Sequence, residues 1–396
     1  MFTIYLIPTA LPVPAARRDQ ATEERNVNAF RWLAGAAALM TTRGLAAQGP
    51  DSSSNPVKIS GYVTSSYFVA TKPTGGAIVG RLYDRFHNQF TANAARITVE
   101  KTVATDKLDA GFRIDALFGQ NAPPIRAAGL SLGDQGDLPQ AFVTLNVPTG
   151  PGTYVQFKAG KMWTLYDVEV VDEVLNPNFS HGYAYIYLTD FTDTGFGIDT
   201  RLSAKVDAQL RLSNGWDVVK DNNKAKTVFG RLGIAPSERV GLAFLGYFGP
   251  EQTDNTSNNR YGAEVIGTFK PSGKATVYTQ LDIGREEGLG PGGGDAKWWS
   301  AGVWTVFDLS PKAALALRGD YMDDRDGART SGVLGFPVVA RRTIGSATAT
   351  VNLKTWDHVL LRPEFRFEHS NHDDFGGAGS QGPTQATFGV ALSYVF

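Results

Sequence analysis

The sequence contains no cysteine among its 396 residues. A disulfide framework, a thiol nucleophile and a cysteine-ligated metal site are therefore all excluded. There is also no large excess of charge, because 38 Lys and Arg stand against 39 Asp and Glu, for a formal net charge of -1. Nucleic-acid-binding domains carry a basic face, so nucleic acid is not an expected partner.

Long apolar runs are missing as well. No segment approaches the roughly 20 apolar residues that a membrane-spanning helix needs, and the mean hydropathy is -0.18. This excludes a helical membrane protein. A transmembrane β-barrel remains allowed, because its strands expose only alternate residues to lipid. The 44 glycines and the aromatic content of 11% favour such a barrel.

The N-terminal region resembles a targeting segment. A short apolar run, "FRWLAGAAALM" (Phe30–Met40), follows Arg25, and small residues offer cleavage after Ala46 or Ala47. Its length and flanks favour a secretory signal peptide over a membrane span; a short buried helix is the alternative. We therefore expect residues 1–47 to be an N-terminal extension plus signal peptide, 48–56 a short periplasmic lead, and 57–396 a single β-barrel domain.

From Val57 onward the chain repeats segments of about ten residues that alternate apolar with polar or small residues. In "LLRPEFRFEHS" (360–370), Leu361, Phe365 and Phe367 oppose charged residues at the positions between them. Such alternation predicts strands with one apolar and one polar face. An Arg turned to lipid at the bilayer midplane costs about 2–4 kcal/mol, so the charged face must turn to water.

About sixteen such segments can be counted by the alternation rule. They begin near Lys58, Asn88, Lys107, Leu138, Thr153, Thr194, Val206, Ala225, Arg239, Arg260, Lys274, Lys297, Ala313, Arg342, His358 and Gln385. Every second connection is short, and the others are long and polar. Outer-membrane barrels sort their connections in this way, with short periplasmic turns and long extracellular loops. The predicted fold is an all-β transmembrane antiparallel β-barrel of about 16 strands.

The last residues, "ATFGVALSYVF" (Ala386–Phe396), form an alternating strand that ends on an aromatic residue. An open edge of this kind invites pairing with other chains. In a closed barrel the last strand pairs with the first, so no edge is left. A soluble β-sandwich is the alternative, but it gives no reason for connections sorted by length.

One stretch supports a narrower comparison. The segment "FKAGKMWTLYDVEVVDEVLNPNFSHGYAYIYLTDFTDTGFGIDTRLS" (157–203) resembles the region after the fifth strand of bacterial outer-membrane porins, and more closely that of the OmpL-like β-barrel porins. A Gly-Lys strand end leads into a loop with acidic, Asn, Ser and Tyr positions, and Thr194-Gly195 opens the next strand. The run "TDFTDTG" carries Asp where His is more usual, so no ligand contact is transferred.

The resemblance implies an outer-membrane porin of a Gram-negative-type bacterium, a water-filled channel for passive diffusion of small hydrophilic solutes and ions. Outer-membrane lipid and these solutes are the implied partners. The terminal Phe396 resembles the signal that the barrel assembly machinery reads. Porins similar to this chain occur as homotrimers and as monomers, and both states stay open. No catalytic residue, metal or cofactor is expected.

In general porins the third long loop folds into the lumen and narrows it. Here that loop is predicted over Thr164–Asp193, far longer than the median loop of about five residues. Selectivity in a pore comes from its diameter and its charged lining. The predicted pore-lining and constriction residues, from this loop and from inward strand positions, are Arg113, Asp115, Lys158, Asp167, Glu169, Asp172, Glu173, Arg211, Asp282, Arg318, Asp320, Arg362, Glu364 and Arg366.

A sharper hypothesis places wall arginines across the lumen from the acidic loop, so that a transverse field orients dipolar solutes. These arginines are Arg211, Arg318, Arg362 and Arg366. The alternative is that the charges only solvate the lumen and pair along the wall.

Three further patterns leave alternatives open. "HSNHDD" (369–374) offers imidazole and carboxylate groups for a divalent metal, but polar residues are ordinary in a surface loop. Ser180-His181 raises an outer-membrane lipase or protease, although no complete catalytic constellation is visible. A non-conducting structural barrel is the remaining class. Trp298, Trp299 and Trp304 are expected to anchor a subunit interface or to contact lipid.

Overall fold

The alternation seen in the sequence runs through sixteen strands of the computed structural model, which describes residues 55–396. The predicted signal peptide and extension lie outside the described residues. The strands are β1 (Lys58–Ala70), β2 (Gln89–Lys101), β3 (Asp109–Phe118), β4 (Gly136–Gly150), β5 (Thr153–Trp163), β6 (Thr192–Arg201), β7 (Val206–Ser213), β8 (Thr227–Ser237), β9 (Val240–Pro250), β10 (Asn259–Ser272), β11 (Ala275–Glu286), β12 (Ala296–Ser310), β13 (Ala313–Asp324), β14 (Arg342–Trp356), β15 (Val359–Ser370) and β16 (Thr384–Val395). Each predicted strand start lies within two residues of an observed one.

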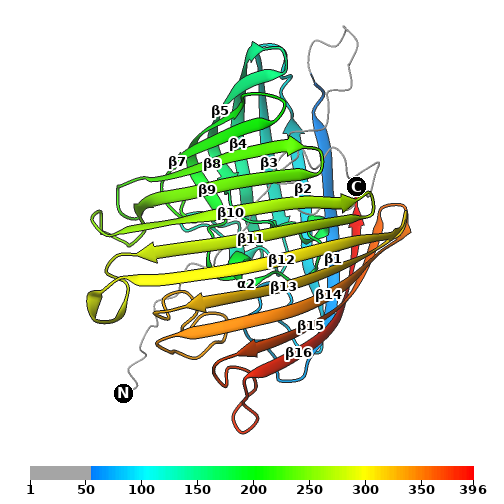
Figure 1. Ribbon diagram of the computed structural model, residues 1–396, viewed down its shortest axis with the longest axis vertical. Coiled ribbons are helices and arrows are strands. Elements are labelled where there is room, and N and C mark those ends of the chain that lie inside the picture. Colours follow the sequence, from blue (N-terminus) through cyan, green and yellow to red (C-terminus); the bar gives the residue numbers. More distant parts are fainter. Residues whose placement is uncertain (1–54) are drawn as a thin grey trace.

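The strands close into one antiparallel barrel, in which each pairs with its sequence neighbours and β16 pairs with β1 (Figure 1). At this seam Phe396 donates its N–H to Gly61 O and accepts the Gly61 N–H, both at 2.9 Å. The Phe396 ring lies against Gly61, where an added Cβ would approach it to 2.8 Å. The predicted closure is confirmed, and it leaves the final strand without a free edge.

The connections alternate strictly in length. Five of the turns that face the predicted periplasmic side contain only two residues (151–152, 238–239, 273–274, 311–312 and 357–358). The loops at the other end include 71–88, 119–135, 325–341 and 371–383. One boundary of the prediction was wrong: Thr192 and Asp193 already pair within β6, so the third loop spans 164–191.

The two faces of the strands differ as predicted. On β16, Phe388, Leu392 and Tyr394 are exposed on the outer surface, whereas Thr387, Ala391 and Ser393 point inward and are buried. On β15, Arg362 and Arg366 point inward and Phe365 and Phe367 outward. The outer surface is therefore an apolar band suited to lipid.

The prediction for the tryptophans was wrong for two of the three. Trp298 and Trp304 occupy inward positions on β12 and are buried, so neither contacts lipid. Trp299 alone points outward, with its ring 5.3 Å from that of Tyr321. Alternation explains this, because residues 298 and 299 are neighbours and must face opposite sides.

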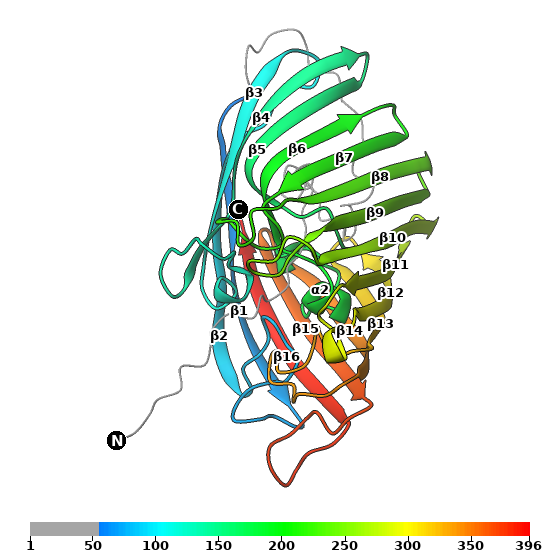
Figure 2. The same ribbon diagram turned by 90° about the vertical axis from the view of Figure 1, so that its left-hand side faces the viewer.

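Helical structure within residues 55–396 is limited to α2 (Tyr183–Tyr187) and three 3₁₀ turns (Pro123–Ile125, Glu173–Leu175 and Pro291–Gly293). None of these described helices has the length and apolar character needed to cross a membrane. Figure 2 shows α2 enclosed by the ring of strands, where it packs against β12 and β13. The third loop is therefore an internal element of the barrel.

Candidate pore constriction

The third loop, residues 164–191, lies inside the barrel along its whole length. Every residue of this segment is buried except Leu175, which is half-buried. Backbone groups shielded from water need partners, because an unpaired one costs about 1–3 kcal/mol. The inner wall supplies these partners at several points around the ring.

The loop first follows the inner face of β8 to β12. Leu165, Tyr166 and Val168 belong to an apolar cluster with wall side chains that include Phe229, Leu245, Tyr247, Ile266, Tyr278 and Trp304. Between them, Asp167 donates its backbone N–H to Glu264 at 3.0 Å, and Val168 donates to Gln280 at 3.1 Å. The first part of the loop thus packs on apolar, inward-facing side chains of these strands.

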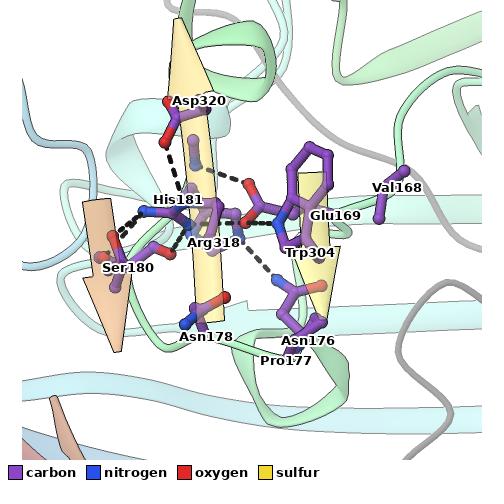
Figure 3. A network of polar contacts seen from close by, with 12 residues as sticks. Val168, Glu169, Asn176, Pro177, Asn178, Ser180, His181, Trp304, Arg318 and Asp320 are labelled. Carbon is purple, nitrogen blue, oxygen red and sulfur yellow. Dashed lines mark hydrogen bonds and ion pairs between the residues drawn. The ribbon is translucent and has the colours of Figure 1, made fainter. Parts of the chain in front are cut away.

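Glu169 is the next fixed point. Its Oε1 lies 2.7 Å from Nη1 of Arg318 and accepts the Trp304 indole N–H at 3.0 Å, while Oε2 accepts the Gly182 N–H at 2.6 Å. Arg318 also donates to the carbonyl oxygen of Ser180 and to Asp320 (Figure 3). Since the side chains of Glu169 and Arg318 are both 0% exposed, this ion pair joins the loop to β13 away from water.

The middle of the loop, residues 176–181, is held by β14 and β15. Arg362 donates to the carbonyl oxygens of Glu173 and, at 2.7 Å, Asn176. Arg366 donates to His181 O. Glu364 accepts the N–H groups of Phe179 at 2.7 Å and Ser180 at 3.1 Å. Wall arginines thus satisfy loop carbonyls, and a wall carboxylate satisfies loop amides.

A further contact reaches the wall on the other side of β16, at β1 and β2. Asp172 accepts the Tyr62 hydroxyl at 2.8 Å and forms an ion pair with Arg96 of β2. Arg96 also pairs with Asp115, which in turn lies 3.1 Å from Nε of Arg113. Together with the Asp167 N–H bond to Glu264 of β10, this contact ties the loop to two strands on opposite sides of the ring, β10 and β2.

The helix α2 contributes an aromatic layer toward the end of the barrel that carries the long loops. Tyr185 and Tyr83 from the first loop share a hydrogen bond of 3.0 Å, and the Tyr83 ring lies edge-on to His181 with centroids 4.9 Å apart. Tyr183 donates its hydroxyl to Glu368. The first and third loops thus pack together inside the lumen.

Two loop groups have strongly shifted pKa values. Burial, with the neighbouring Asp172 carboxylate, raises the pKa of Glu173 to about 7. Burial likewise lowers the pKa of His181 to about 3, and Arg318 and Arg362 add to that shift. His181 is therefore neutral at physiological pH, and its ring hydrogen-bonds Asn176 and Val170 O.

The structure divides the predicted site residues into two groups. Those in contact with one another around the loop are Asp167, Glu169, Asp172, Glu173, Arg318, Asp320, Arg362, Glu364 and Arg366, with Arg113, Asp115 and Asp282 connected to them through wall partners. Lys158 and Arg211 lie apart, on β5 and β7, where both form ion pairs with Asp199.

This placement differs from the hypothesis of wall arginines that face the acidic loop across the lumen. Arg318, Arg362 and Arg366 touch the third loop directly and are buried, so they do not face it across open water. Arg211 pairs along the wall instead. The reason is that the loop packs onto the arginine-bearing strands.

Several residues of the network were not predicted as pore-lining or constriction residues: Tyr62, Arg96, Glu264, Gln280, Trp304 and Glu368. Glu368 and Gln280 each lie two positions from a residue predicted to face inward on the same strand, so the alternation could have identified them. Tyr62 and Trp304 carry no such signal, because an aromatic side chain fits either face of a porin strand.

The weaker patterns are accounted for in other ways. Asp374 accepts two hydrogen bonds from Arg342, at 2.7 and 2.9 Å, and His369 points outward. Within residues 55–396 no group of three or more His, Asp or Glu is placed to hold a metal ion. Ser180 Oγ accepts a hydrogen bond from Arg318 at 3.3 Å, while the His181 ring bonds Asn176 and Val170.

Comparison with known families finds one match over nearly all of the described chain. Residues 56–396 match the family described as "Putative beta-barrel porin-2, OmpL-like". No curated protein matches the sequence significantly.

Solved structures share the fold at low identity. An anion-selective porin from Comamonas acidovorans is similar with a TM-score of 0.60 and 11% identity, covering 86% of this chain and 99% of its own. The outer membrane channel DcaP of Acinetobacter baumannii gives 0.56 and 12%, covering 86% and 97%. The trimer form of OmpT, an outer membrane protein of Vibrio cholerae, gives 0.55 and 12%, covering 86% and 99%.

Proposed function

Because the chain belongs to the OmpL-like family of β-barrel porins of the Gram-negative outer membrane, we propose that it is a passive channel for small hydrophilic solutes and ions whose lumen is narrowed by residues 164–191. The observation that carries this proposal is the burial of the third loop inside a closed barrel, with bonds to β10 and β2 on opposite sides of the wall. A loop anchored in this way leaves only part of the lumen cross-section for water.

The predicted site residues then divide into two roles. Arg318, Arg362, Glu364 and Arg366 anchor the loop, since their hydrogen bonds go to the loop. Lys158 and Arg211 line the remaining passage beside β5 to β8. Supporting this, both residues pair with Asp199 on β6, and Arg201 on the same strand is half-exposed.

Conduction is the direct test. The full-length protein, refolded and inserted singly into a planar bilayer, should give discrete current steps that are proportional to voltage. Adding a small sugar, a dipeptide or a carboxylate separates a general channel from a selective one, since only a bound solute interrupts the current. A folded protein that inserts without any conductance would contradict the proposal and favour a structural barrel.

We propose further that the chain has no hydrolytic activity, because the Ser180 hydroxyl and the His181 ring are each bonded to other groups. Ester or peptide hydrolysis by purified protein that disappears in the Ser180→Ala variant would show the opposite.

Two partners also belong to this proposal. A homotrimer is supported by the fold shared with a trimeric outer-membrane protein, and native mass spectrometry in mild detergent would measure the stoichiometry. Phe396, which ends the closing strand, is proposed as the contact for the barrel assembly machinery.

A further inference from the structure

Four basic residues form a row across the outer rim of β11 to β14. Arg285 on β11 pairs directly with Lys297 on β12. The N–H of Arg325 donates to Lys297 O at 3.0 Å, and the pairing of Asp324 with Arg342 places Arg325 beside Arg341. These strands are neighbours in the barrel (Figure 1). The four residues, Arg285, Lys297, Arg325 and Arg341, are called the basic rim below.

The basic rim faces away from the lumen. Its members alternate along the chain with inward, buried residues: Glu286, Trp298, Asp324 and Arg342. The side chains of Arg325 and Arg341 are each 57% exposed and that of Arg285 is 43% exposed. The guanidinium and ammonium groups are thus open to the surroundings of the barrel.

Aromatic side chains mark the depth of the basic rim. On the outer face, nearer the barrel middle, the tilted rings of Trp299 and Tyr321 lie against each other, two residues from Lys297 and four residues from Arg325. Arg285 lies over the Tyr261 ring at 5.7 Å. Aromatic girdles sit where a barrel crosses the membrane interface. Because the long loops mark the outer side of the membrane, the basic rim lies at the headgroup level of the outer leaflet.

Three carboxylates accompany the basic rim. Asp323 pairs with Arg341 at 2.9 Å and with Arg325 at 3.5 Å, and Asp295 pairs with Arg285. Asp326 accepts the backbone N–H of Lys297 at 2.9 Å. Each guanidinium has five N–H donors, so these contacts orient the arginines and leave donors for another acceptor. Among the described residues no carboxylate forms an ion pair with Lys297.

Other parts of the rim have a different character. At the corresponding ends of β1, β2, β3 and β9, the outward residues are Val69, Phe90, Phe118 and Phe248. The cationic row is therefore a local feature of one sector and not a general property of the barrel mouth.

We propose that the basic rim binds the phosphate groups of a phosphorylated glycolipid of the outer leaflet, namely lipopolysaccharide. Arginine pairs with phosphate in a bidentate manner, and several such groups in a row match a headgroup with more than one phosphate. The acyl chains would then lie against outward apolar residues directly below, such as Ile283 and Leu281. The inference rests on the outer-membrane location and not on conduction.

The test uses the full-length protein in detergent and titrates it with bisphosphorylated lipid A, followed by native mass spectrometry. The variant Lys297→Gln/Arg325→Gln/Arg341→Gln should bind roughly 100-fold more weakly, on the basis of about five-fold for each charge near the membrane surface. The matched control, Lys220→Gln/Lys224→Gln/Lys226→Gln, removes the same charge from exposed residues of the loop between β7 and β8 and should bind like the wild type.

Two further arms identify the ligand source. Dephosphorylated lipid A should bind the wild-type protein as weakly as bisphosphorylated lipid A binds the triple variant. Millimolar inorganic phosphate should not displace the lipid. The proposal would be overturned if the wild type and the triple variant bound lipid A equally. It would also be overturned if the wild type bound dephosphorylated and bisphosphorylated lipid A equally, or if free phosphate displaced the lipid. The variant Arg325→Lys/Arg341→Lys keeps the charge and should lose less than roughly ten-fold, which guards against a mere folding defect.

Discussion

The anchoring of the third loop depends most on Arg318, and its replacement by alanine is the sharpest test of the constriction. Arg318 contacts Glu169, the Ser180 carbonyl and, at 3.0 Å, the Thr348 hydroxyl. Without it, the Glu169 carboxylate keeps the Trp304 and Gly182 N–H groups but loses its ion-pair partner inside the barrel.

Breaking a buried pair by removing one partner costs about 3–5 kcal/mol. We take this as the loss of loop docking, because the strands on either side of Arg318 keep their ladder of hydrogen bonds. At 1.4 kcal/mol for each factor of ten, the ratio of released to docked loop rises between about one hundred-fold and several thousand-fold. A loop that is rarely released in the wild type would then be released often.

Two measurements report on this release. Hydrogen exchange of the peptide covering residues 176–182 should speed up, and single-channel records should show larger or more variable conductance. Arg211→Ala is the matched control for hydrogen exchange, because it also removes an inward arginine but one that bonds to Asp199 and not to the loop. In the double variant Glu169→Ala/Arg318→Ala the cost should be well below the sum of the single costs, since neither charge is left alone. Exchange of residues 176–182 in Arg318→Ala that matches exchange in Arg211→Ala, together with wild-type conductance in Arg318→Ala, would refute the anchoring role.

Three other outcomes are expected. Lys158→Gln/Arg211→Gln leaves Asp199 without its two ion-pair partners, so the anion-to-cation permeability ratio should fall roughly five-fold, as expected for about 1 kcal/mol between charges in water. The zero-current potential in a KCl gradient measures this ratio. An unchanged potential would show that these residues do not line the passage. Because docking holds the pKa of His181 at about 3, the released loop takes up a proton below the ordinary value of 6.5, and His181 contributes about 1.4 kcal/mol per pH unit toward release as the pH falls below that value. Glu173, whose pKa docking raises from 4.5 to about 7, opposes this contribution between these two values, so the His181 part is read from the difference between two proteins. Exchange of residues 176–182 in wild type relative to His181→Gln should show this dependence, and parallel pH curves would contradict it. Phe396→Ala should lower the amount of folded protein in the outer membrane while refolding in detergent is retained; normal membrane levels would exclude Phe396 as an assembly signal.

The sequence alone was sufficient for the strands. Residues such as Phe365, Arg366, Phe367 and Glu368 alternate so sharply that their faces follow from the cost of exposing charge to lipid. The same alternation predicted the start of every strand to within two residues, and the sorting of loop lengths predicted which ends lie on the same side. These features are local, because each strand faces lipid on one side and the lumen on the other.

Contacts across the lumen were beyond the reach of the sequence. Arg318 and Arg211 look alike in an alternating strand, yet one is buried against Glu169 and the other pairs with Asp199 on the wall. The course of residues 164–191 through the lumen decides which arginine contacts the loop. Aromatic packing, such as that of Tyr166 against Phe229 and Tyr247, fixes this course. Contacts between residues 137 to 186 positions apart produce no periodic pattern in the sequence.

The sequence by itself determined a closed sixteen-stranded barrel with an apolar outer face and a charged inner face, because period-two alternation encodes the environment of each side chain. Only the tertiary structure decided that the inward charges mostly hold a loop and that four basic residues meet in a row on the outer rim. The physical reason is that alternation fixes the side of the wall on which a residue lies, whereas cross-strand register and loop packing fix what it touches.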